Sequence, residues 1–156
     1  MVIKHHRLRL DGHFHILLAA LQALLRRVVA RPSGAQQAYA KQFTGLMRLI
    51  CEPTDDATAR SHAAGGGGGL DSDKDEAKRY AGGYMYLVLM QYVKLQFECA
   101  VPHEVTETLE PGMYAVLDVT TADGLRIMND AMDPAGRAMF KLLYSRYQQF
   151  GKWTGV

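Results

Sequence analysis

The sequence predicts an all-α protein, an irregular bundle of five to seven helices of the kind that forms the closing cap of a helical solenoid. Three observations predict this fold: apolar residues recur at three- and four-residue spacing, strand patterns are few, and no fixed repeat is visible. The chain has 156 residues, of which 48% are hydrophobic and 22% charged. This size and composition are typical of one globular domain.

Two amphipathic helices are predicted before residue 53. Residues 14–29 carry an apolar stripe, and Arg31-Pro32 ends this helix because the residue before a proline disfavours helical backbone. A second helix spans about residues 35–50 and ends at Glu52-Pro53.

Residues 53–73 differ from the rest of the chain because they contain a run of five glycines and almost no large apolar residue. Such a segment buries too little surface to offset its ordering entropy, so we expect a flexible surface loop. The glycine run is not a phosphate-binding loop, since Leu70-Asp71 follows where lysine and serine or threonine are needed.

A long helix is predicted over about residues 73–97, with Gly82-Gly83 marking a bend or the close approach of another helix. Pro102 starts a short helix to about residue 109. Glu110-Pro111-Gly112 is predicted to break it, and residues 113–119 to resume as helix, although their pattern also suits a strand.

The last part of the chain is predicted to form a turn at residues 120–124 and then two helices. Asp133-Pro134 indicates a helix start, with Asp133 as the N-cap and Pro134 at the first helical position. The final helix ends at Gly151 as its C-terminal cap, and Trp153 is predicted to fold back onto the bundle.

Charge is distributed unevenly, although the formal net charge is only +2. Residues 1–31 hold six lysines and arginines against one aspartate, and residues 134–156 hold four and no acid. Residues 80–133 hold eight acids against two basic residues. If the two basic ends meet, they form a positive face for phosphate or an acidic partner; otherwise they are ordinary solvated surfaces.

A histidine-rich stretch near the start, with His13 and His15, does not have the spacing of a metal site. Residues two apart point in different directions on a helix, whereas structural zinc sites use ligand pairs at defined spacing. We therefore predict no metal and no cofactor. Cys51 and Cys99 lack a CxxC spacing and are interpreted as reduced, buried thiols.

The sequence predicts that this domain is not an enzyme. It contains no Gly-x-Ser-x-Gly elbow and no HExxH, and Asp55 and Asp56 fall in the predicted flexible loop. No apolar run reaches the roughly 18 residues of a membrane helix. We expect neither membrane contact nor a small-molecule substrate.

Five segments, in order along the chain, resemble the C-terminal domain of the unhealthy ribosome biogenesis protein 2 family. The first is the histidine–arginine–leucine stretch from His5, which continues through Gly12 and His15 into a Leu-Gln-x-Leu-Leu helix. The others are Tyr39 to Pro53, Leu109 to Asp118, Asp133 to Tyr144, and Phe150 to Trp153. Two positions depart from the family pattern: His13 stands where the family has arginine, which weakens the case for a phosphate contact there, and Pro134 is atypical but suits a helix start.

The resemblance implies that residues 1–156 are a single C-terminal domain of a much longer helical protein, with no catalytic residues. It implies a scaffold in the nucleus, within a nucleolar assembly for early 60S precursors and pre-ribosomal RNA processing. Its expected partners are a second large helical scaffold and a DEAD-box RNA helicase. The alternative is a module that binds pre-ribosomal RNA directly through its basic N- and C-terminal faces.

Two sets of residues are singled out on these grounds. The candidate contacts for a partner or RNA are His6, Arg7, Arg9, His13, Arg26, Arg27, Arg137 and Lys152. The residues of the family motifs, which we expect to be structural, are Gly12, His15, Pro111, Gly112, Tyr114, Asp118, Gly136, Phe140, Tyr144, Gly151 and Trp153.

Overall fold

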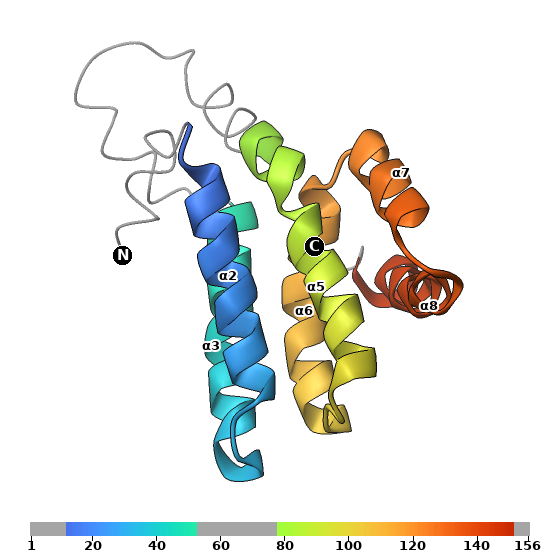
Figure 1. Ribbon diagram of the computed structural model, residues 1–156. Coiled ribbons are helices and arrows are strands. Elements are labelled where there is room, and N and C mark those ends of the chain that lie inside the picture. The colour runs from blue at the N-terminus through green and yellow to red at the C-terminus, as the bar shows by residue number, and fades with distance from the viewer. Residues whose placement is uncertain (1–11, 53–77, 152–156) are drawn as a thin grey trace, which may run out of the picture.

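The computed structural model describes residues 12–52 and 78–151, and within these ranges the secondary structure consists of helices joined by short connections, with no strand (Figure 1). The named helices are α2 (Phe14–Val29), α3 (Ser33–Cys51), α5 (Tyr86–Glu98), α6 (His103–Val119), α7 (Ala122–Ala131) and α8 (Pro134–Phe150). With the short helix over 78–84, the described residues form seven helical segments, which confirms the predicted all-α irregular bundle. The predicted loop at 53–73 lies outside the described residues, and the solenoid cap stays a prediction.

Four helices form the centre of the bundle. α2 packs on α3 and α5, and α6 packs on α3 and α5, so the four contacts close into a ring (Figure 1). The α3–α6 contact is the most extensive of these. α7 and α8 lie to one side, against α5 and α6. The core consists of apolar side chains from every helix, and its largest fully buried members include Leu21, Leu25, Met47, Met85, Leu89, Leu95, Leu109, Met113, Met128 and Leu143.

The predicted break at Glu110-Pro111-Gly112 is wrong, because α6 runs without interruption from His103 to Val119 with Pro111 inside it. α3 packs against α6 at this point. The Thr44 hydroxyl donates a 2.7 Å hydrogen bond to the Thr108 carbonyl, in the turn that precedes the proline. A Cβ on Gly112 would lie only 3.1 Å from Thr44 Cα, so glycine lets the two helices approach closely.

The starts of α7 and α8 follow from their N-caps. The Asp133 carboxylate accepts a 2.8 Å hydrogen bond from the Gly136 N–H, and Pro134 occupies the first turn, as predicted. The predicted turn at 120–124 is too long, since α7 begins at Ala122. The reason is that the Thr121 hydroxyl accepts from the Gly124 N–H at 3.1 Å, which caps a helix that starts three residues earlier than predicted.

Of the two alternatives predicted at Gly82-Gly83, the close approach is present, and the helix is interrupted two residues further on, at Met85. The helical segment 78–84 gives way at Met85 to α5, so the long helix is divided in two. Gly82 is buried against the end of α6, where a Cβ would collide with the Val119 carbonyl oxygen. The glycine therefore sets how closely residue 82 can approach the end of α6.

The end of α8 differs in detail from the prediction. Gly151 is the C-cap, but its backbone is right-handed, with a φ of −77°, so a left-handed turn does not require glycine here. A Cβ at this position would instead collide with the Tyr147 ring, which explains the small residue. Trp153, predicted to fold back, lies outside the described residues.

We expect Gly82→Ala to lower the free energy of unfolding by about 1–3 kcal/mol, because the new methyl group meets a backbone oxygen that cannot rotate away. Gly83→Ala is the matched control. Nothing lies within 4 Å of a Cβ at residue 83, so this variant gains about 0.5–1 kcal/mol from its better helix propensity. Urea unfolding followed by circular dichroism measures both. Equal effects of the two substitutions would contradict the close approach.

Candidate functional site

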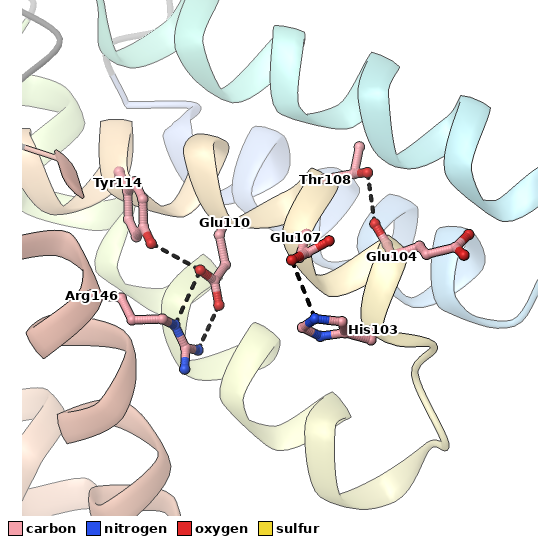
Figure 2. A network of polar contacts seen from close by, with 7 residues as sticks. All are labelled: His103, Glu104, Glu107, Thr108, Glu110, Tyr114 and Arg146. Atoms are coloured by element: carbon pink, nitrogen blue, oxygen red, sulfur yellow. Dashed lines mark hydrogen bonds and ion pairs between the residues drawn. The ribbon is translucent and has the colours of Figure 1, made fainter. Parts of the chain in front are cut away.

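The densest polar cluster joins α6 to α8. Glu110, Tyr114 and Asp118 follow one another at four-residue spacing on α6, so they lie along one face of that helix. Arg146 of α8 makes a two-pronged ion pair with Glu110, with Nη2 2.5 Å from Oε1 and Nε 3.2 Å from Oε2 (Figure 2). The Tyr114 hydroxyl donates to the same carboxylate at 2.8 Å. We call this cluster the α6–α8 polar seam: it consists of Glu110, Tyr114 and Asp118 of α6 and of Arg146 and Tyr147 of α8.

The second half of the seam is built on tyrosines. The Tyr147 hydroxyl donates to Asp118 Oδ1 at 2.5 Å. Its ring lies 5.8 Å, between centroids, from the ring of Tyr114 and also from that of Tyr144. These distances are typical of favourable tilted aromatic pairs. The seam therefore combines charge-assisted hydrogen bonds with aromatic packing.

The environment raises the pKa values of these two hydroxyls above the ordinary tyrosine value. Burial, followed by the hydrogen bond to Glu110, raises the pKa of Tyr114 to about 12. Burial, followed by the hydrogen bond to Asp118, also raises the pKa of Tyr147 well above its ordinary value. Each hydroxyl is thus a donor toward a carboxylate, and the cluster holds α8 against α6 in one orientation.

Three of the segments that carry the family resemblance meet beside the seam. A small pocket of about 70 Å³ is lined by residues from α3, its C-cap, α6 and the end of α8: Arg48, Glu52, Pro111, Tyr114, Ala115, Asp118 and Gly151. These residues are far apart in sequence. They converge at the junction of α3, α6 and α8.

A larger groove lies between α5 and the α7–α8 connection, and we call it the α5–α8 groove. Its volume is about 650 Å³, and its lining is mostly apolar. The lining residues are Gln22, Leu87, Met90, Gln91, Val93, Lys94, Phe97, Glu98, Ala131, Met132, Asp133, Ala135 and Gly136. The Gln22 amide donates to the Leu87 carbonyl at 3.3 Å, whereas the buried Gln91 amide nitrogen has no hydrogen-bond partner among the described residues.

The four predicted contact residues that the structure describes, His13, Arg26, Arg27 and Arg137, lie on or beside two different helices and are not gathered into one surface. His13, Arg26 and Arg27 are exposed on or beside α2, and Arg26 reaches only a long ion pair with Glu98, at 3.9 Å. Arg137 is exposed on α8, on the other side of α5 (Figure 1). The remaining candidates, His6, Arg7, Arg9 and Lys152, lie outside the described residues.

The predicted motif residues divide into three groups. Gly12 precedes α2 with a φ of +74°, a left-handed conformation that favours glycine. Pro111, Gly112, Tyr114, Asp118, Gly136 and Gly151 lie at helix contacts or caps, as described above. His15 is exposed, and Phe140 and Tyr144 are only half-buried, so these three contribute little to the core. Trp153, the remaining motif residue, lies outside the described residues.

Sequence reasoning missed three members of the seam: Glu110, Arg146 and Tyr147. The four-residue spacing of Glu110 with Tyr114 was visible, but the partner arginine lies 36 positions away. Nothing local distinguishes Arg146 from a solvated arginine on an amphipathic helix. Only the packing of α8 on α6 identifies it.

Two further features bear on function. Across residues 12–52 and 78–151, no group of three or more histidines, cysteines, aspartates or glutamates is placed to hold a metal ion. In the same ranges, no helix has both the length and the apolar character that crossing a membrane requires.

The fold and the seam define a class: an all-helical domain with a polar cluster that fastens one helix to another and with a mostly apolar groove beside α5. The profile of the Urb2/Npa2 family matches residues 1–156, and the chain belongs to that family. No match was found among curated proteins or among solved structures. Membership gives the chain a role in ribosome biogenesis and implies, in general, a nuclear or nucleolar location. The resemblance seen in the sequence is confirmed.

Removing the arginine of the seam should destabilise the fold. The Glu110 side chain is 12% exposed and that of Arg146 40%, so Arg146→Met leaves a shielded carboxylate without its cation. We expect a loss of about 1.5–3 kcal/mol in the free energy of unfolding. Arg48→Met removes an exposed pair with Glu52 and should cost less than about 1 kcal/mol. Similar losses in the two variants, measured by urea unfolding, would show that the seam is no stronger than a surface pair.

The seam also predicts how stability depends on alkaline pH. Because folding raises the pKa of Tyr114 from its ordinary value near 10 to about 12, the folded state holds this proton more tightly. The resulting stability is complete below about pH 10 and is lost as the pH rises toward 12. Tyr114→Phe should flatten this decline, whereas Tyr84→Phe, at an exposed ring stacked on Phe14, should leave it unchanged. The urea midpoint measured against pH tests both variants.

Proposed function

We propose that this domain is a non-catalytic docking module in an early 60S pre-ribosome assembly, and that the α5–α8 groove is its docking surface. Two observations support the proposal. The chain belongs to a ribosome biogenesis family, and the lining of the α5–α8 groove is mostly apolar. The resemblance described above makes the second large helical scaffold of that assembly the expected partner and the nucleolus the expected site of action.

The groove suits a helical segment of a protein partner. Phe97 is 53% exposed at its wall, and Leu87, Met90 and Val93 follow at helical spacing along the same side of α5. An apolar trough between helices of this kind accepts the apolar face of an amphipathic helix. Lys94, Glu98 and Asp133 at the groove supply charges of both signs, which would fix the orientation of that helix.

The polar groups of the seam support a non-catalytic role. A general base or nucleophile must be able to reach a substrate proton or atom. Glu110 instead accepts hydrogen bonds from Arg146 and Tyr114, and Asp118 accepts one from Tyr147. These carboxylates are engaged in fastening α8 to α6.

Docking is tested by measuring the affinity of this chain for the second large scaffold. Phe97→Asp places a charge in the groove and should weaken binding about tenfold or more. Leu142→Asp is the matched control, because Leu142 is exposed to a similar extent, 57%, but does not line the groove. No binding by the unaltered chain would refute the docking function. Equal weakening by both variants would refute the groove as its location.

A further inference from the structure

A second concavity, on another face of α8, differs in chemistry from the groove. It has a volume of about 340 Å³ and lies between α7 and α8. Its lining residues are Asn129, Arg137, Ala138, Phe140, Lys141 and Tyr144. We call it the α8 aromatic pocket. None of these six lining residues is acidic, two are cations and two are aromatic.

The two cations are placed to hold an anion. Arg137 and Lys141 are one helical turn apart and both exposed. Arg137 Nη1 donates to the Asn129 carbonyl at 3.3 Å, which orients the guanidinium across the pocket toward α7. Two aspartates precede α8: Asp130 is exposed on α7 next to Asn129, and Asp133 is engaged at the helix cap, where its Oδ1 accepts the Gly136 N–H. α8 itself contains no acidic residue between Pro134 and Phe150.

The two aromatic rings supply a flat apolar surface beside these charges. The Phe140 and Tyr144 ring centroids are 6.0 Å apart, and the rings are tilted by 39°. Both side chains are half-buried, and Tyr144 also packs on Tyr147 of the polar seam. The seam therefore fixes the position of one ring, while part of each ring remains accessible from the pocket.

We propose that the α8 aromatic pocket binds a nucleotide of single-stranded RNA, with the base stacked on Phe140 and Tyr144 and the phosphates near Arg137 and Lys141. Bases stack on aromatic rings while cations follow the phosphate backbone, and this combination is typical of single-strand binding. A duplex keeps its bases stacked on one another and offers no free base face. The proposal is independent of the docking groove, because no residue lines both concavities.

The test measures fluorescence anisotropy of a labelled single-stranded RNA of about 12 nucleotides, and of its duplex, with the full 156-residue chain. We expect tighter binding of the single strand. Phe140→Leu keeps an apolar side chain but removes the ring, and it should weaken binding roughly 5- to 100-fold. Circular dichroism shows whether the variant remains folded.

A second variant tests the charges without disturbing packing. Arg137→Gln with Lys141→Gln should reduce the slope of log affinity against log salt by about 1.4, or about 0.7 for each phosphate contact. Lys41→Gln with Lys78→Gln removes the same charge from exposed positions outside the pocket, and should leave this slope nearly unchanged.

Three results would overturn the proposal. One is equal affinity for single-stranded and duplex RNA, and another is an unchanged slope in the Arg137/Lys141 variant. The third is displacement of the RNA by an acidic peptide that binds more tightly and depends on the same two cations, which would make this a protein-binding pocket. Phe97→Asp should not alter RNA binding, so failure here is distinguishable from failure of the docking proposal.

Discussion

The close contact between α3 and α6 is the constraint on which the rest of this structure depends. Gly112 allows the two helices to approach, and the Thr44 hydroxyl bonds to the Thr108 carbonyl just before Pro111. A proline inside a helix normally kinks or breaks it. Because α6 continues instead, Glu110 and Asp118 stay on one face of one helix, and α8 can attach along that face.

Apolar burial supplies most of the stability of such a bundle, and polar contacts select among its packings. α8 is an example in which polar contacts matter most, because only Gly136, Leu143 and Tyr147 of this helix are buried. With so few apolar anchors, its rotation and register depend on the ion pair and hydrogen bonds to α6. That orientation in turn sets the shape of both concavities along α8, the apolar groove and the aromatic pocket.

The two concavities give one helix two chemically distinct faces. One is mostly apolar with a mixed-charge rim and suits a partner helix; the other combines cations with aromatic rings and suits RNA. Under the two proposals, separate faces of α8 hold a protein partner and an RNA strand at a fixed spacing.

The sequence by itself determined the all-α class, the helix start at Asp133-Pro134 and the family, because capping and apolar spacing are local signals. It misjudged Pro111, since α6 continues through this proline and packs there against Thr44 of α3, a residue far away in sequence. It also could not find the Glu110–Arg146 pair or distinguish a half-buried Phe140 from a core residue. Only tertiary packing decides these features, because they depend on which helix faces which.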